Sequence, residues 1–381
     1  MRSAAALACV ALLVALSQSH GSPPRALAPA TLQTAKPAAA VTPAWLTYHL
    51  DNARTGNDTT EGTVNGVTPA WTSPTLDGQV LASPLVYGSS AYVATENNTL
   101  YALSTADGSV QWSVHTLTPE ASNVLPCGNI SPSVGVTGTP VIDPAGDAGN
   151  GVLFMVGMTS EPHYRLWGID LVTHAIVFNS TVDPATISIQ GQRGALAISG
   201  GNVYIPYGGR WGDCYAGSTP YYGIVIGVPE NGAAHFAWNP AGTEASGIWA
   251  PGGEAIDGSG NVYVATGNGV GPGSESVFKL SPTLAVLNQW RPINHQYLDD
   301  HDIDVGSISP GLVGGGDVFQ NGKFGQGFLL SSSLAQLTAD PGLTSCGGLN
   351  SDASFGATSY AAPYIYVPCS NGLYVYTQSG S

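Results

Sequence analysis

The feature that most constrains this chain is a repeated unit of short strands. Its clearest copy is residues 83–112, which read SPLVYGSSAYVATENNTLYALSTADGSVQW. Short apolar runs alternate with Gly, Asn and Asp, a pattern typical of antiparallel strands joined by tight turns. Asp107-Gly108 is a strong hairpin signal before the last run. The unit therefore predicts a sheet of four antiparallel strands.

The same order of strands recurs along the chain, in residues 138–178, 194–238, 252–290, 309–334 and 356–376. One four-stranded sheet cannot bury both faces, whereas sheets set around a common axis bury them against each other. Copies spaced by about 40–55 residues are typical of β-propellers. We therefore expect an all-β propeller of four-stranded antiparallel blades, about six to eight of them.

Aromatic residues end several copies, and we expect them to pack between blades rather than to bind a ligand. They are Trp112, Phe178, Trp238 and Trp290. An outer-membrane barrel is disfavoured, because the strands are short and several are apolar on both faces.

The two ends of the repeat array are incomplete. Residues 69–76 (PAWTSPTL) look like a lone outer strand before the first full copy, and the last copy lacks its outer strand. Two interpretations stay open. In the first, residues 69–76 complete the last blade, and that closure removes two open sheet edges. The alternative is a truncated chain with further blades.

The charge balance excludes some partners. The formal net charge is −15, with only 10 Lys and Arg residues and 9% charged residues. This balance argues against nucleic acid and anionic membrane surfaces as partners.

The N-terminus indicates export. A basic start, an apolar run over residues 4–16 and small residues up to Gly21 have the layout of a secretory signal peptide. We expect a signal peptide at 1–21, a disordered Pro/Ala-rich linker at 22–44 and one propeller domain at 45–381. No later run is long enough for a transmembrane helix. The mature protein is therefore expected to be an extracellular or periplasmic monomer.

Export affects how the cysteines are interpreted. Four remain after the signal peptide: Cys127, Cys214, Cys346 and Cys369. An even number in an oxidising compartment predicts two disulfides, with three possible pairings. We favour Cys346–Cys369 together with Cys127–Cys214. No Cys-x2-Cys spacing suggests zinc.

The repeat AYVATENNTLYALSTADGSVQW resembles the pyrroloquinoline quinone (PQQ) repeat family. The opening WLTYHLDNARTG at 45–56 is similar to the N-terminal segment of secreted members. These repeats occur in quinoprotein dehydrogenases and in non-enzymatic propellers such as the outer-membrane assembly lipoprotein. The resemblance implies the fold and leaves the function open.

One region resembles the quinoprotein alcohol dehydrogenases more closely. The resemblance implies that Trp249 (in GIWAPGG) is the floor under a quinone, that Asn268 (in ATGNG) and Asp304 are metal ligands, and that Asp302 is the catalytic base. It thereby implies PQQ with Ca²⁺ or a lanthanide. An aromatic floor stacks on a flat cofactor, oxygen ligands suit a hard cation, and a carboxylate accepts the alcohol proton.

The sequence also departs from this pattern. Residues 135–140 (GVTGTP), where the family has a metal-ligating Glu, contain no carboxylate, and the vicinal Cys-Cys that covers the quinone is absent. Trp249 has an alternative role in blade packing, Asn268-Gly269 in a hairpin turn, and the acidic run 299–304 in a solvated loop.

Two functions follow from these observations. The first is a binding or scaffold propeller for a protein, glycan or small-molecule ligand, which uses one face or the central channel. The second is a quinoprotein-like dehydrogenase that acts on an alcohol-type substrate.

Overall fold

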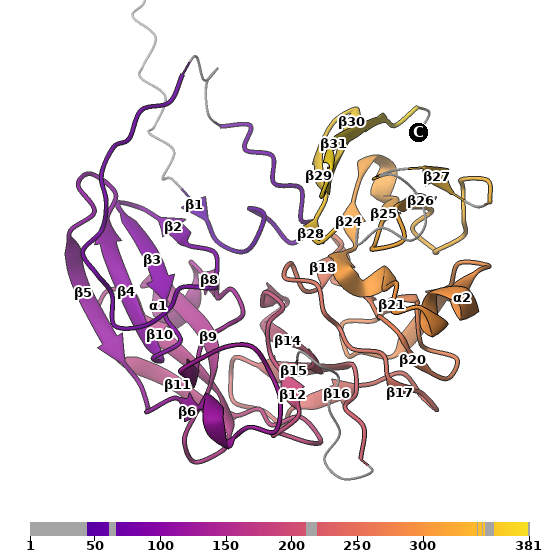
Figure 1. Ribbon diagram of the computed structural model, residues 1–381. Helices are drawn as coiled ribbons and strands as arrows, with labels where there is room; N and C mark the ends of the chain where they lie inside the picture. Colours follow the sequence, from indigo (N-terminus) through magenta and orange to yellow (C-terminus); the bar gives the residue numbers. More distant parts are fainter. Residues whose placement is uncertain are drawn as a thin grey trace, which may run out of the picture. The chain divides into compact units, whose positions relative to one another are not determined.

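The computed structural model describes residues 44–60, 66–210, 219–340, 342–344, 346 and 354–379. The expected signal peptide and almost all of the expected linker lie outside these residues. Within the described ranges, no helix is long and apolar enough to cross a membrane. Short strands dominate, and they form the sheets that the repeats predict (Figure 1).

The first repeat forms the first sheet, in the order β1-β2-β3-β4-β5 with every pair antiparallel. Gly108 adopts a left-handed φ of +73° in the turn before the last strand, a conformation that glycine adopts without strain. The strands are β1 (Ala44–Trp45), β2 (Leu85–Tyr87), β3 (Ser90–Ala94), β4 (Thr99–Ser104) and β5 (Val110–His115).

Each later repeat forms a further antiparallel sheet. The second contains β8 (Val141–Asp143), β9 (Val152–Met158), β10 (Tyr164–Asp170) and β11 (Ile176–Thr181), and the third contains β12 (Gln190–Gly191), β13 (Ala197–Ser199), β14 (Asn202–Gly209), β15 (Ile224–Pro229) and β16 (Phe236–Trp238). The fourth contains β18 (Ala255–Ile256), β19 (Val262–Ala265), β21 (Val277–Leu280) and β22 (Val286–Trp290). The fifth contains β24 (Gly311–Leu312), β25 (Val318–Gln320), β26 (Gln326–Leu330) and β27 (Leu343–Thr344), and the last contains β29 (Ser359–Ala361), β30 (Tyr364–Cys369) and β31 (Gly372–Thr377).

Short elements lie between these sheets and in the loops within them. The two-stranded pairs are β6 (Glu120–Ala121) with β7 (Ser133–Val134), β17 (Glu244–Ala245) with β20 (Gly269–Val270), and the parallel pair β23 (Ile308–Ser309) with β28 (Gly356–Ala357). The helical turns are η1 (Ser122–Val124), α1 (Gly146–Gly149), α2 (His295–Asp300), η2 (Val305–Ser307) and η3 (Gly314–Gly316).

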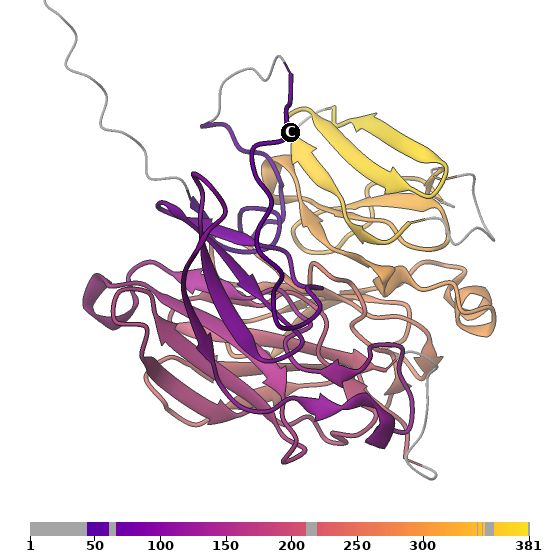
Figure 2. The same ribbon diagram turned by 60° about the vertical axis from the view of Figure 1, so that its left-hand side comes forward.

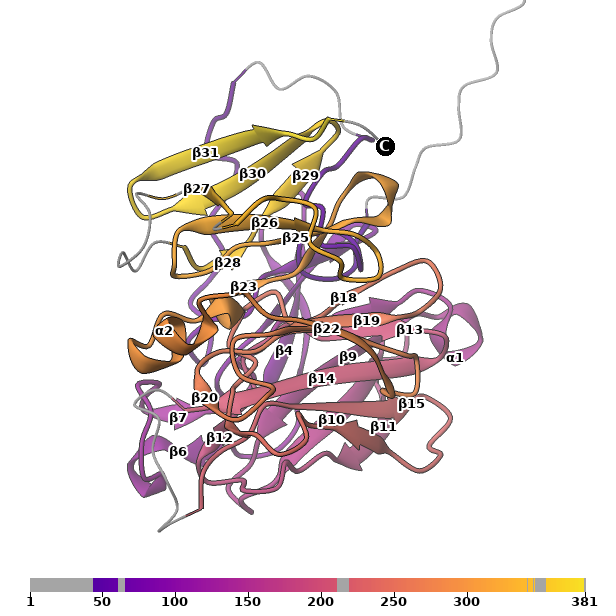
Figure 3. The same ribbon diagram turned by 90° about the vertical axis from the view of Figure 1, so that its right-hand side faces the viewer.

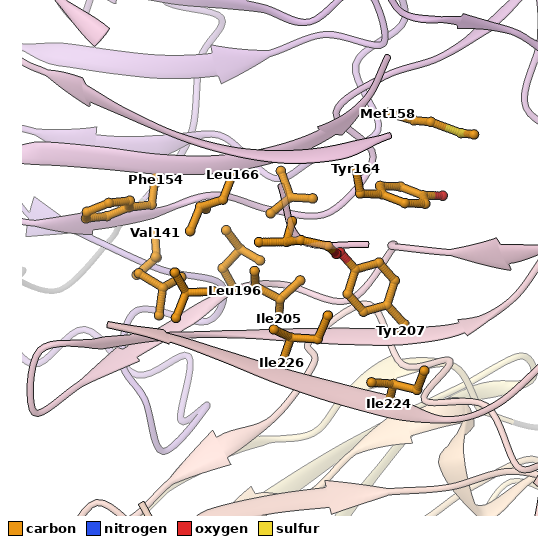
Figure 4. Close-up of a cluster of buried hydrophobic side chains, with 14 of the residues drawn as sticks. Val141, Phe154, Met158, Tyr164, Leu166, Leu196, Ile205, Tyr207, Ile224 and Ile226 are labelled. Atoms are coloured by element: carbon orange, nitrogen blue, oxygen red, sulfur yellow. The ribbon is translucent and has the colours of Figure 1, made fainter. Parts of the chain in front are cut away.

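Neighbouring sheets bury their faces against each other. Figure 4 shows the apolar layer between the second and third sheets, which includes Phe154, Leu166, Ile205 and Ile226. Equivalent layers lie between the other successive sheets, from the first to the last. Figures 2 and 3 show the last sheet, in yellow, beside the fifth, and their inner strands β24 and β29 are in contact. This packing is that of the predicted β-propeller.

The aromatic residues that end the repeats lie at these boundaries. Trp112 stacks on His174 of the second sheet, with ring centres 4.4 Å apart. Trp238 and Trp290 each contact a phenylalanine of the following sheet at 4.8 Å, Phe278 and Phe328 respectively. The predicted role between blades is confirmed for these three tryptophans, whereas Phe178 contacts Phe154 of its own sheet.

The prediction that residues 69–76 complete the last blade is wrong. This segment forms no strand, and Trp71 donates a hydrogen bond from Nε1 to the Thr105 carbonyl of the first sheet at 2.9 Å. The Trp71 ring lies on Gly108, where a Cβ atom would collide with it. The glycine of the Asp-Gly turn therefore provides the docking place for this tryptophan.

Residues 46–55, called the brace here, link the inner strands instead. Brace carbonyls accept hydrogen bonds of 2.7 to 3.0 Å from backbone N–H groups of the second, fourth, fifth and last sheets: Ile142, Ile256, Leu312 and Tyr360. Brace side chains bond the third sheet through Thr47 to the Leu196 carbonyl and through Asn52 to the Ile198 carbonyl. Together with the β1–β2 pairing, the N-terminal segment is thus tied to each of these sheets.

Arg54 is the buried centre of the brace. Its guanidinium donates to three backbone carbonyls and one hydroxyl: Glu254 at 2.9 Å, Tyr48 at 3.0 Å, Leu196 at 3.2 Å, and Thr47 Oγ1 at 2.7 Å. Burial lowers the pKa of Arg54 to about 10, so the group remains charged at neutral pH.

Glu254 makes the stability of the fold depend on pH. Its side chain is fully buried, and burial raises its pKa from 4.5 to about 8, although Arg54 lowers it. The folded protein therefore keeps a proton that the unfolded chain releases. This stabilisation is complete below about pH 4.5 and is lost as the pH rises through about 8.

We expect the Glu254→Gln variant to lose less stability than the wild type between pH 5 and 8 in stepwise urea denaturation. Parallel profiles would contradict this expectation.

The structure confirms the Cys346–Cys369 disulfide, which joins residues 23 apart. Cys127 is also disulfide-bonded, while its expected partner Cys214 lies outside the described residues.

We expect Cys346→Ser and Cys369→Ser, singly or together, to lower the free energy of unfolding by about 2–3 kcal/mol under non-reducing conditions. Equal stability of the wild type and the double variant would contradict this.

Candidate functional site

The predicted site residues lie on loops of the fourth sheet and of its connection to the fifth. Trp249 precedes β18, Asn268 lies between β19 and β20, and Asp302 and Asp304 lie between α2 and η2. Figure 1 shows α2 near β20, and the two are joined by a hydrogen bond between Gly269 and Asp299.

Trp249, Asn268 and Asp304 come together around Gly267. The Asn268 N–H donates to Asp304 Oδ1 at 2.8 Å. A Cβ atom on Gly267 would collide with that carboxylate and would lie 2.7 Å from Trp249 Nε1. The absence of a side chain at Gly267 therefore allows the tryptophan and the aspartate to approach the same turn.

Asp302 and Asp304 differ in environment. The Asp302 side chain is 65% exposed and that of Asp304 only 6%. Both pair with Lys323, whose Nζ lies 3.3 Å from Asp302 Oδ1 and 2.6 Å from Asp304 Oδ2. Burial opposes the ammonium charge, but the two aspartates outweigh it and raise the pKa of Lys323.

Sequence reasoning missed Glu275, which supports the Asp304 loop from beneath. Its Oε2 accepts the Val305 N–H at 2.6 Å, and its own N–H donates to the Gly267 carbonyl at 3.0 Å. Burial, and then the Asp304 charge, raise the pKa of Glu275 well above its ordinary value.

Asp299 holds the Asn268 turn from the other side. It accepts hydrogen bonds from Gly269 N–H at 3.0 Å and from Ser274 Oγ at 2.8 Å, and it lies 3.7 Å from Arg291. Burial raises the pKa of Asp299 although these partners lower it. Within the acidic run, Asp299 thus contacts Gly269, Ser274 and Arg291, whereas Asp302 and Asp304 contact Lys323. Gly269 is the first residue of β20 and does not form a two-residue hairpin turn with Asn268.

Trp249 does not occupy a blade boundary in the manner of Trp112. It makes an edge contact with Tyr221, with ring centres 5.3 Å apart, and the Arg193 guanidinium carbon lies 5.7 Å from its ring centre. Glycines 208, 209 and 247 leave room for its indole, since a Cβ atom on any of them would come within 3.1 Å of the ring.

Three buried polar atoms around Gly267 have no hydrogen-bond partner among the described residues: Trp249 Nε1, Asn268 Oδ1 and Glu275 Oε1. Most buried polar atoms in native proteins are paired, and orphaned ones often mark the place of a ligand. One donor, one acceptor and one carboxyl group form a set suited to a polar organic molecule.

This arrangement does not fit a quinone with a hard cation. Both Asp304 oxygens already have partners, Lys323 and the Asn268 N–H. Across the described ranges, no group of three or more His, Cys, Asp and Glu residues could hold a metal ion.

Comparison with known proteins agrees with this fold. Residues 68–156 match the family profile described as outer membrane protein assembly factor BamB, a PQQ-repeat profile. This chain is a β-propeller of the PQQ-repeat type. No curated protein matches its sequence significantly.

Solved structures similar to this PQQ-repeat propeller include BamB and two dehydrogenases. BamB from Moraxella catarrhalis has a TM-score of 0.50 and 14% identity, over 80% of this chain and 74% of that one. The quinohemoprotein alcohol dehydrogenase from Comamonas testosteroni has a TM-score of 0.57 and 16% identity, over 86% of this chain and 57% of that one. A europium-containing methanol dehydrogenase has a TM-score of 0.55 and 13% identity, over 86% of this chain and 68% of that one. At these identities the likeness concerns the fold alone.

Proposed function

We propose that this chain is an exported binding propeller that holds a small polar molecule at the Trp249 cluster, meaning Trp249, Asn268, Glu275, Asp304 and Lys323. The observation that carries the proposal is the set of three orphaned buried atoms at Gly267. The bound molecule would accept a hydrogen bond from Trp249 and donate one to Asn268. Export is supported by the N-terminal apolar run and by the Cys346–Cys369 disulfide.

Basic side chains supply the positive charge of this site. Lys323 lies against the Asp304 carboxylate and Arg193 lies over the Trp249 ring. The chain has only 10 basic residues, so two at one site are a notable share. We therefore expect binding to be independent of added metal.

A PQQ-dependent dehydrogenase is the second candidate, and it is favoured by the convergence of Trp249, Asn268 and Asp304 at one turn. We derive no catalytic step through a quinone or a cation, because both oxygens of Asp304, the expected metal ligand, already have partners.

One experiment separates the two candidates. The purified chain is incubated with PQQ alone, with Ca²⁺ or with a lanthanide, desalted, and measured for quinone absorbance and for dye-linked alcohol oxidation. The binding function predicts retention without metal and no dye reduction. Metal-dependent retention with dye reduction that Asp302→Ala abolishes would establish the dehydrogenase instead. The absence of retention under every condition would exclude both at this site.

A further inference from the structure

A cavity of about 430 Å³ adjoins the Trp249 cluster. Its walls come from the η1–β7 connection, from β10 and from the segments around β12 and the end of β14. Arg193 lines the cavity and also lies over Trp249, and Gly209 lines it and leaves room for the same indole. The cavity has the size of a small-ligand site.

Arg210 is a buried cation in the wall of this cavity, with 6% of its surface exposed. Its guanidinium donates to neutral acceptors: the Ser188 carbonyl at 2.8 Å, Tyr164 Oη at 3.0 Å and Met158 Sδ at 2.9 Å. None of the ion pairs in the described part of the chain involves Arg210. A buried charge without a directly paired carboxylate is costly, so an anion in the adjoining cavity would stabilise it.

Glu96 is the acidic group that acts on Arg210 from the first sheet. Its carboxylate accepts hydrogen bonds from the Gly135 N–H at 2.5 Å and from Thr137 Oγ1 at 2.7 Å. Burial raises the pKa of Glu96 although these bonds and Arg210 lower it. The hydrogen bonds of the Glu96 carboxylate therefore go to Gly135 and Thr137, and its charge acts on Arg210 without a direct ion pair among the described residues.

The remaining wall is partly apolar. Leu125, Ile130 and Val134 line the cavity together with Arg193 and Arg210. A bound molecule therefore meets cationic groups and hydrocarbon in one space. A guanidinium binds a carboxylate through two parallel hydrogen bonds, which a neutral amide cannot reproduce.

We propose that this cavity binds a small monocarboxylic acid, with its carboxylate at Arg210 and Arg193 and its apolar body against Leu125, Ile130 and Val134. The inference deepens the proposed function and rests on it, because Arg193 lines the cavity and also lies over Trp249 of the cluster.

Isothermal titration of the full chain with benzoate, benzamide and inorganic phosphate tests the proposal. Benzoate is expected to bind at least about tenfold more tightly than benzamide, which lacks the charge, and than phosphate, which lacks the apolar body. Arg210→Gln is expected to weaken benzoate binding by at least about tenfold. Lys279→Gln, which removes a cation that pairs with Asp257 away from the cavity, is the matched control and should leave the affinity unchanged.

Equal affinity for benzoate and benzamide, or unchanged benzoate affinity in a folded Arg210→Gln variant, would overturn the proposal. Tighter binding of phosphate than of benzoate would also overturn it and assign the cavity to inorganic anions. If Arg210→Gln does not fold, as judged by circular dichroism, Arg193→Gln replaces it and must weaken benzoate binding by the same test. Loss of benzoate binding with PQQ still retained would remove this inference alone, whereas loss of both ligands in the folded wild type would remove the proposed function as well.

Discussion

The Arg54→Ala variant is expected to lose about 4 kcal/mol of its free energy of unfolding. The substitution removes the donor for three backbone carbonyls and the Thr47 hydroxyl, all in the brace or in the sheets it links. The Leu196 carbonyl and the Thr47 hydroxyl would keep their mutual hydrogen bond, whereas the Glu254 and Tyr48 carbonyls would lose the Arg54 donor. Each buried orphan costs about 1–3 kcal/mol. The loss would also detach the segment that ties the inner strands together.

Urea denaturation followed by circular dichroism measures this effect. Arg165→Ala is the matched control, because Arg165 makes only a 3.9 Å contact with the exposed Glu161. We expect a loss below about 1 kcal/mol there. A similar small loss in Arg54→Ala would show that the brace does not stabilise the propeller.

Replacing Lys323 by methionine is expected to lower the free energy of unfolding by about 3 kcal/mol. The change keeps most of the apolar side-chain volume but leaves the buried Asp304 carboxylate without its cation. The Asn268 N–H would remain as a single hydrogen-bond donor to that carboxylate.

A double-mutant cycle with Asp304→Asn isolates this pair. The Asp304→Asn change keeps an oxygen for the Asn268 N–H and removes the charge, so the double variant should recover part of the stability lost in Lys323→Met. The coupling energy is expected to be at least about 1 kcal/mol. Additive losses in the two single variants would show that the ion pair does not contribute.

The sequence determines the sheets because their signals are local. Alternation and the Asp107-Gly108 turn lie within one repeat, and so does each strand pair they predict. The brace escaped prediction because its bonds join residues such as Thr47 and Leu196, which are 149 positions apart. The predicted place of Trp71 in the last blade is also wrong because its contact with Gly108 of the first sheet has no local sequence signal.

The same difference between local signals and contacts of distant residues applies to the candidate site. Spacing along one repeat and its loop identified Trp249, Asn268 and Asp304, which do lie at one turn. Lys323 and Glu275 are single charged residues in apolar or glycine-rich surroundings, and only their contacts reveal their place beside Asp304. Arg193 lies over Trp249, and Arg193 and Arg210 both line the cavity. These contacts join residues that are distant in the sequence, so no local pattern predicts them.

The most direct test of the binding function is the amount of PQQ that the metal-free protein retains on gel filtration, compared between the wild type and Trp249→Leu. The account predicts retention of about one equivalent by the wild type, loss in Trp249→Leu, and full retention in Trp71→Leu, whose tryptophan lies on the first sheet. Equal retention by folded Trp249→Leu and wild-type protein, or none by the wild type, would contradict it.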